Sequence, residues 1–272
     1  MNTAIIGAGS IGVAFAVAFS RAGGQVSMYD PDASRRQAAL AEVRQCLADL
    51  QSFQLLDEDP SAVAARVQAT DSLEDAVREA DLVQECAPEK ADLKRDLFAR
   101  VAAAAPAHAV LASASSALPV SQYAPEGEAR ERCLVAHPGN PPYLIPVIEL
   151  VPAPFTSART IERAEALYRS FGLSPVKVRK EVEGFIFNRL QGAVLREAYC
   201  LVRDGVADVE DIDTVMRDGL GLRWSFMGPF ETVDLNTRGG ILSHADKMGP
   251  AYARMGAERG QNDPGSPSWS PG

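Results

Sequence analysis

The chain contains three histidines, and the surroundings of one of them favour acid–base chemistry. His137 ends an apolar run, residues 133–136, and enters a loop rich in proline. Imidazole titrates near neutral pH, so a histidine at such a loop is suited to take a proton from a substrate. Glu149 lies within another apolar run, residues 145–151, where a carboxylate needs a partner. A His137–Glu149 pair would orient the imidazole and raise its basicity, although the residues alone also allow a purely structural histidine.

A glycine-rich turn near the N-terminus has the features of a dinucleotide-binding site. Residues 7–12 read GAGSIG and lie between a short apolar run and an Ala/Val/Phe-rich segment of helical pattern. In such a turn the first glycine permits the bend, the second lets the backbone approach a pyrophosphate, and the third allows close helix–strand packing. The free N–H groups at the helix start attract the anion. The alternative is a turn needed only for packing; the expected cofactor contacts are Gly7, Gly9, Ser10, Ile11 and Gly12.

Asp30 indicates which dinucleotide this turn accepts. It ends the second expected strand, residues 25–30. A carboxylate at that place accepts hydrogen bonds from the adenosine ribose hydroxyls and repels a 2′-phosphate, so NAD is expected rather than NADP. Arg35 and Arg36 are close enough in sequence to weaken this preference, but on a helix we expect both to face solvent.

The elements that must position these residues alternate between strands and helices. This alternation predicts an α/β fold, a Rossmann-type doubly wound parallel sheet with right-handed crossovers. The carboxyl ends of parallel strands face the ligand crevice, which is where His137 lies. The expected strands are 3–6, 25–30, 67–70, 82–85, 109–112, 133–136, 145–151 and 175–178, and the expected helices after the glycine turn are 33–55, 71–80 (capped by Asp71), 91–105 and 156–171.

Beyond residue 182 the pattern becomes wholly helical. Helices are expected over 185–202, 209–216 and 230–245, followed by a shorter irregular ending. A helical unit of this size is marginal alone, so we expect it to pack on the first domain and on a second subunit. The predicted organisation is a NAD-binding domain over 1–182, a small all-helical substrate and dimerisation domain over 183–259, and a flexible Gly/Pro/Ser-rich tail over 260–272.

Three long segments give the chain a family resemblance. They read AHPGNPPYLIPVIELVP (136–152), EGFIFNRLQGAVLREAYCLVRDGV (183–206) and GLGLRWSFMGPFETVDLN (219–236). Together with the glycine turn, they resemble the 3-hydroxyacyl-CoA dehydrogenase superfamily, and within it the lambda-crystallin and L-gulonate 3-dehydrogenase branch. The resemblance covers roughly residues 2–245. It implies an enzyme in which a histidine takes the proton of a secondary alcohol while hydride leaves the same carbon for the nicotinamide.

The resemblance implies a role for each of four catalytic residues. His137 is the implied base and Glu149 its acidic partner. Asn188 matches the asparagine that orients the reacting oxygen, and Ser116 matches the serine that hydrogen-bonds the substrate. Neutral donors of this kind suit a developing oxyanion. Gly139 departs from the pattern, because the family tends to carry a bulkier apolar residue there, and this puts the shape of the pocket in doubt.

Further residues are implied to lie at the cofactor. Glu89 and Lys94 match contacts on the nicotinamide side, and Asn140 matches an asparagine near cofactor and substrate. Taken without the resemblance, the first two are a solvated helix start and the third is a turn residue before proline. After about residue 245 the family's longer helical ending is not matched, which puts dimer packing in doubt.

Charge bears on the substrate. The chain has 27 Lys and Arg against 36 Asp and Glu, a net charge of −9, which argues against a nucleic-acid or membrane-surface partner. Acidic residues outnumber basic ones in both 31–66 and 183–245, where a coenzyme A site would need cations. A small hydroxy acid therefore fits better, and we expect Arg223 to clamp its carboxylate; an ordinary surface ion pair is the alternative for Arg223.

The sequence therefore predicts an NAD-dependent 3-hydroxy acid dehydrogenase acting on an L-gulonate-like substrate. Four scattered cysteines without metal-site spacing indicate free thiols in the cytoplasm and no metal. A homodimer is expected from the family. Two alternatives remain: a 3-hydroxyacyl-CoA dehydrogenase acting on a CoA thioester, and a non-catalytic crystallin-like NAD(H)-binding protein.

Overall fold

The computed structural model describes residues 1–259 and divides the chain into two compact units. The first unit is Met1–Asn188 and the second begins at Arg189. The division falls later than the predicted boundary after residue 182, because Phe185 is buried in the core of the first unit. The predicted tail, 260–272, lies outside the described residues.

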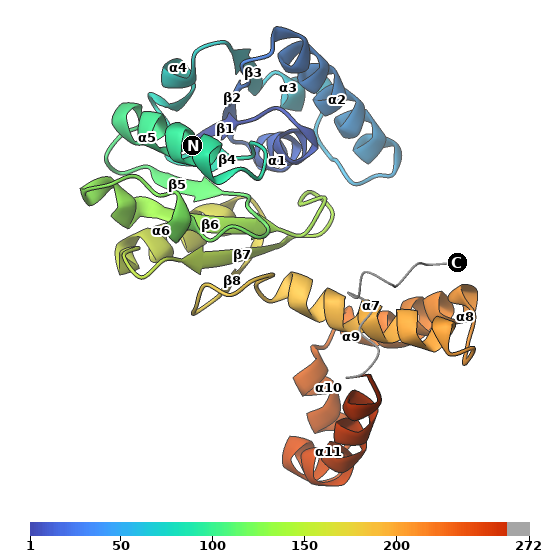
Figure 1. Cartoon of the computed structure of the whole chain (residues 1–272). Coiled ribbons are helices and arrows are strands. Elements are labelled where there is room, and N and C mark those ends of the chain that lie inside the picture. Colours follow the sequence, from blue (N-terminus) through green and yellow to red (C-terminus); the bar gives the residue numbers. More distant parts are fainter. Residues whose placement is uncertain (260–272) are drawn as a thin grey trace. The chain divides into compact units, whose positions relative to one another are not determined.

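The first unit is built on one sheet of eight strands (Figure 1). Its spatial order is β3-β2-β1-β4-β5-β6-β7-β8, so the chain starts inside the sheet and winds outward in both directions. This is the doubly wound, Rossmann-type arrangement that the alternating pattern predicted. The strands are β1 (Asn2–Ile6), β2 (Gln25–Tyr29), β3 (Val67–Thr70), β4 (Leu82–Glu85), β5 (Val110–Ser113), β6 (Cys133–Pro138), β7 (Val147–Pro152) and β8 (Ser174–Lys177).

Strand β7 departs from the predicted parallel order. It pairs antiparallel with β6, whereas the other neighbouring strands of the sheet pair parallel. The connection 139–146 between β6 and β7 is too short for the crossover that a parallel return requires. The chain therefore turns straight back, and the register places His137 directly opposite Glu149.

Helices cover both faces of this sheet. Side chains alternate along each strand, so Ile5 packs into one core cluster while Ala4 and Ile6 pack into the other. The first cluster contains residues of α1, α2, α3 and α6, and the second contains residues of α4 and α5. The helices are α1 (Ser10–Arg21), α2 (Ala33–Ser52), α3 (Pro60–Ala64), α4 (Leu73–Val77), α5 (Ala91–Ala104) and α6 (Ala158–Ser170), with short 3₁₀ turns η1 (Val120–Gln122) and η2 (Glu128–Arg132).

Polar side chains fix where several of these helices begin. Asp32 accepts a hydrogen bond from Ser34 N at the start of α2, and Asp59 caps α3 in the same way. The prediction that Asp71 caps a helix to residue 80 was wrong. Ser72 is the cap, since its hydroxyl accepts from Asp75 N, and the helix is only α4.

The second unit is helical throughout the part that the structure describes. The prediction of one helix over 230–245 was wrong: α10 ends at Asn236, and Gly239 (φ 94°) and Gly240 (φ 71°) form a left-handed break before α11. The predicted irregular ending was also wrong, because α11 continues to Arg259. The elements are α7 (Phe187–Arg203), α8 (Val209–Thr214), a π-helical turn η3 (Val215–Leu220), α9 (Gly221–Trp224), α10 (Pro229–Asn236) and α11 (Gly240–Arg259). Among the helices of residues 1–259, none is both long and apolar enough to span a bilayer.

Candidate active site

The glycine turn between β1 and α1 has the shape that a dinucleotide requires. Gly7 has φ 107°, and a Cβ there would lie 2.8 Å from the Cys86 carbonyl oxygen. A Cβ on Gly12 would lie 2.0 Å from the Gly7 carbonyl oxygen, so only glycine allows this helix to approach the strand so closely. Around Gly9, in contrast, no atom lies within 4 Å of the Cβ position. The turn is closed on the protein side and open at Gly9, which fits backbone contact with a pyrophosphate.

Asp30 lies against this turn, and its expected contact with the cofactor ribose stays a prediction. Its Oδ2 accepts a hydrogen bond from Ala8 N at 2.9 Å, and its Oδ1 accepts one from Asp32 N at 3.0 Å. The expectation that Arg35 and Arg36 face solvent was wrong. Arg35 Nε donates to the Ala8 carbonyl at 2.6 Å, and Arg36 donates to the Asp30 carbonyl at 2.7 Å. Both guanidiniums thus find backbone acceptors on the turn and strand that their helix packs against.

His137 and Glu149 form a buried pair at the same edge of the sheet. His137 Nδ1 lies 2.8 Å from Glu149 Oε2, and the two residues are 7% and 2% exposed. They are direct cross-strand neighbours in the β6–β7 register. Alternation along both strands turns their side chains to the α4/α5 face, where the imidazole packs 5.6 Å from the Phe185 ring centre. The pairing that the residues alone suggested is therefore present.

Glu149 also holds the start of α7. Its Oε1 accepts hydrogen bonds from Ile186 N at 2.7 Å and Phe187 N at 2.9 Å. The chain bends just before them through Gly184 (φ 73°) and Phe185 (φ 47°), which turns these successive N–H groups toward the carboxylate. Burial acts to raise the pKa of Glu149, but the hydrogen bonds from His137 and the two N–H groups outweigh it and hold that pKa below its usual value.

Three further predicted residues lie around this edge. Asn188 is in the first turn of α7, directly after the two N–H groups that Glu149 binds. Ser116 is exposed in the loop after β5, and Asn140 is exposed in the loop after β6, before a cis peptide bond to Pro141. Gly139 is enclosed, since a Cβ there would lie 2.6 Å from Ile145 Cγ2. The neighbouring apolar side chains therefore fill the space that a larger residue would need.

Arg223 belongs to the second unit. It lies in the short helix α9 and is exposed. Its suggested contact with a substrate carboxylate stays a prediction.

Glu89 positions the loop that carries Ser116. Its Oε1 accepts hydrogen bonds from the Ser115 hydroxyl at 2.5 Å and from Ala117 N and Leu118 N at 3.0 and 3.1 Å. These donors lower the pKa of Glu89 although burial opposes them. Glu89 is therefore a loop-positioning residue in this structure, and its expected cofactor contact stays a prediction.

Lys94 differs from what the sequence suggested. It is 1% exposed, so it is not at a solvated helix start. Its expected contact with the cofactor stays a prediction. Its ammonium bonds both oxygens of Glu85, at 2.8 and 2.9 Å, and lies 3.5 Å from Glu89 Oε2. The long side chain reaches inward from α5 because a buried carboxylate at the end of β4 attracts it.

Glu85 was missed by the sequence reasoning. It accepts hydrogen bonds from Lys94, the Ser113 hydroxyl and Ala87 N, and burial raises its pKa in spite of them. Glu149 was predicted because it is a carboxylate within an apolar run. The same signal is present at Glu85, which ends the short strand segment Leu82–Glu85, and could have identified it. Through Lys94 and Ser113, Glu85 connects β4, β5 and α5 at the edge where the site lies.

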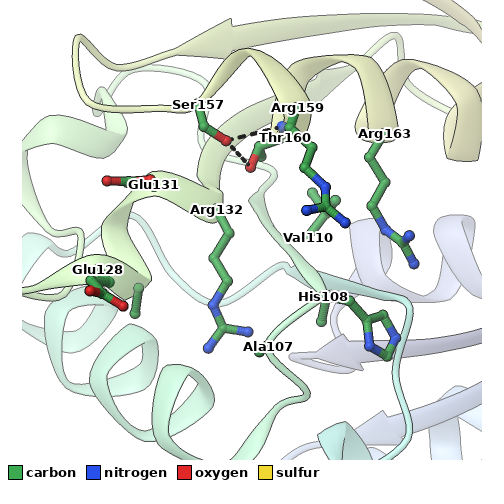
Figure 2. A pocket seen from close by; sticks show the side chains of 12 residues that line it. Ala107, His108, Val110, Glu128, Glu131, Arg132, Ser157, Arg159, Thr160 and Arg163 are labelled. Atoms are coloured by element: carbon green, nitrogen blue, oxygen red, sulfur yellow. Dashed lines mark hydrogen bonds between the residues drawn. The ribbon is translucent and has the colours of Figure 1, made fainter.

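A cavity of about 570 Å³ lies elsewhere on the first unit. Figure 2 shows Arg132, Arg159 and Arg163 reaching into it, with Ser157 and Thr160 hydrogen-bonded to each other at its rim. Two of these guanidiniums hold the fold together: Arg132 donates to the carbonyl of Ala102 in α5 and to that of Pro106 after α5, and Arg163 pairs with Asp81. None of the predicted site residues lines this cavity, so its chemistry is separate from the His137 site.

The lowered pKa of Glu149 predicts a pH-dependent contribution to stability. A depressed carboxyl pKa stabilises the fold fully above the ordinary glutamate pKa, and the contribution is lost as pH falls through the lower folded value. Glu149→Gln should therefore cost about 2 kcal/mol of unfolding free energy at pH 7, and the gap from the unsubstituted chain should shrink between pH 5 and 3. Urea titrations across this range measure it. The exposed Glu126→Gln serves as control, and a gap independent of pH would contradict the assignment.

Two family models match the chain. That of the 3-hydroxyacyl-CoA dehydrogenase NAD binding domain matches residues 2–182, and that of the same family's C-terminal domain matches 184–263. Lambda-crystallin of Oryctolagus cuniculus is 40% identical over 253 residues, covering 92% of this chain and 79% of that protein. L-carnitine dehydrogenase of a Pseudomonas species is 41% identical over 252 residues, covering 91% and 77%.

Solved structures agree with the fold. The crystal structure of 5-formyl-3-hydroxy-2-methylpyridine 4-carboxylic acid 5-dehydrogenase, described as an NAD⁺-dependent dismutase, superposes with a TM-score of 0.81. It is 33% identical, and the match covers 93% of this chain and 80% of that one. With both family models and relatives at about 40% identity in agreement, the chain belongs to the 3-hydroxyacyl-CoA dehydrogenase family, in its lambda-crystallin branch.

Proposed function

We propose that the protein is an NAD-dependent dehydrogenase that oxidises the 3-hydroxyl of a small, L-gulonate-like hydroxy acid. The observation that carries this proposal is the buried His137–Glu149 pair, with a contact of 2.8 Å. It lies at the sheet edge that also carries the glycine turn and Asp30. A histidine held by a carboxylate supplies a base with a fixed orientation.

The contacts of the pair support a role for one particular imidazole nitrogen. An ionised carboxylate can only accept, so we assign the hydrogen of the 2.8 Å contact with Glu149 Oε2 to Nδ1. Nε2 then has the free lone pair and takes the proton of the substrate hydroxyl. The hydride leaves the same carbon, so the alcohol becomes a ketone. NAD, when bound, supplies the hydride acceptor. The imidazolium that forms stays beside the Glu149 carboxylate, which stabilises its charge.

Neutral donors complete the proposed site. Asn188 would orient the reacting oxygen, and the Glu149 bonds to Ile186 N and Phe187 N fix the start of the helix that carries it. Ser116 would bind the substrate from a loop that Glu89 ties down. Such donors gain strength as negative charge develops on the oxygen.

The relatives favour a free acid over a thioester. L-carnitine, the substrate in the name of one relative, is a 3-hydroxy acid with a free carboxylate, and the dismutase-like neighbour is named for a carboxylic acid. The family description and a 3-hydroxybutyryl-CoA dehydrogenase structure at 30% identity favour the second candidate, a CoA thioester. The excess of acidic residues in 31–66 and 183–245 weighs against that second candidate.

The exposed apolar side chains of the second unit support a homodimer. Phe226, Phe230, Leu235 and Leu242 are each more than 70% exposed, and exposed large apolar side chains that gather on one unit favour a protein partner. We propose a second copy of the chain as the partner. Light scattering should then give twice the chain mass of 29.0 kDa, and a mass of one chain at micromolar concentration would contradict it.

Activity across a substrate panel tests the proposed reaction. NADH formation at 340 nm should occur with 3-hydroxy acids, and His137→Asn should lower kcat/KM by about 10²- to 10⁴-fold because the base is lost. His108→Asn, outside the site, is the matched control. Turnover of thioesters alone would favour the acyl-CoA candidate. NAD binding without turnover of any substrate would favour the non-catalytic, crystallin-like alternative.

Arg223 is proposed as the clamp for the substrate carboxylate. Arg223→Met should raise KM for a free hydroxy acid far more than for its methyl ester, because only the acid carries the charge that a guanidinium binds. Arg217→Met, an exposed arginine of the same unit paired with Asp218, is the control. Equal effects of Arg223→Met on acid and ester would rule the clamp out.

A further inference from the structure

The glycine turn is held between two opposite charges. At one residue, Ala8, the N–H donates to the Asp30 carboxylate at 2.9 Å and the carbonyl accepts from Arg35 Nε at 2.6 Å. A guanidinium therefore lies on the turn beside the carboxylate that is expected to select the cofactor. Arginine is the side chain best suited to bind a phosphate, and its presence here is at odds with a site that rejects the 2′-phosphate of NADP.

A second carboxylate resolves this conflict. Glu42 lies two turns further along α2 on the same face as Arg35. Its two oxygens accept from Arg35 Nη1 and Nη2 at 2.8 and 2.6 Å, a bidentate pair. These bonds lower the pKa of Glu42, so it is ionised at neutral pH. Arg35 thus donates through Nε to the Ala8 carbonyl and through both terminal nitrogens to the Glu42 carboxylate. Its positive charge is balanced by Glu42, and each of its three nitrogens already has an acceptor.

We propose that Glu42 is a specificity-positioning residue, which keeps Arg35 from serving a 2′-phosphate. Discrimination against NADP(H) then depends on two carboxylates: Asp30, which repels the phosphate directly, and Glu42, which withholds the arginine that would bind it. Glu42 can have this role only if the turn binds NAD, as proposed above. Removing Glu42 leaves Arg35 anchored at Ala8 with two free donors beside Asp30.

Arg36 is the rival for the same role. Its Nη1 donates to the carbonyls of Asp30 and Pro31 at 2.7 and 3.3 Å. These are neutral backbone acceptors, so Arg36 is not held by a bidentate carboxylate pair as Arg35 is. If Arg36 governed phosphate binding, Glu42 would have no influence on it.

Binding of NADH and NADPH by isothermal titration calorimetry tests the inference, because the two ligands differ only in the 2′-phosphate. Glu42→Gln should lower the Kd ratio of NADPH to NADH about tenfold, the size of a charge-assisted contact. Asp30→Ser/Glu42→Gln should lower it by more than the product of the single effects. Adding Arg35→Met to that double variant should bring the Kd ratio back to that of Asp30→Ser alone, whereas adding Arg36→Met should leave the lowered ratio unchanged.

A matched control separates this effect from net charge. Glu58 is held by Arg66 through both oxygens, as Glu42 is by Arg35, but lies in the loop before α3. Glu58→Gln makes the same charge change and should leave the Kd ratio as it is. Provided that NADH still binds, two results would overturn the inference: an unchanged Kd ratio of NADPH to NADH in Glu42→Gln, or a lowered ratio that requires Arg36. Absence of NADH binding to the unsubstituted chain overturns the dinucleotide site itself.

Discussion

The Glu149 carboxylate is the interaction on which the rest of the site depends. It is 2% exposed, and a buried carboxylate without partners costs several kcal/mol. Its partners come from different parts of the chain: the His137 imidazole on β6, and the N–H groups of Ile186 and Phe187 before and at the start of α7. Satisfying one charge thus fixes the histidine, the end of the first unit and the helix turn that carries Asn188.

A second buried carboxylate works in the same way on the neighbouring strands. Glu85 at the end of β4 binds Lys94 from α5 and Ser113 from β5. Lys94 in turn lies near Glu89, which holds the loop of Ser116. The charge of Glu85 at the end of β4 is therefore paired with Lys94 from α5, and Glu89 beside Lys94 ties down the exposed loop of Ser116.

The His137–Glu149 pair and the glycine turn are the two predictions with which the structure agrees best. Both came from residues whose type is unusual for their surroundings. A histidine and a glutamate in apolar runs predicted each other, because neither can be buried alone, and the glycine turn was recognisable because its three glycines have separate steric reasons. The solvent-facing positions considered for Lys94 and Arg35 were wrong for the opposite reason. Long side chains travel far from their own backbone, so their position on a helix did not reveal that Glu85 and Ala8 lie within their reach.

The sequence by itself determined the succession of the eight strands in the first unit, the glycine turn, the His137–Glu149 pair and the family. These features depend on local sequence patterns and on the polarity of single residues, and both can be read directly from the amino-acid sequence. Only the tertiary structure decided that β7 runs antiparallel and that Gly239 and Gly240 interrupt a helical pattern. It also decided that Arg35 lies on the Ala8 carbonyl and that Lys94 is buried on Glu85. Such pairings follow from which surfaces are packed together, and no period or composition encodes the distance between two side chains on different elements.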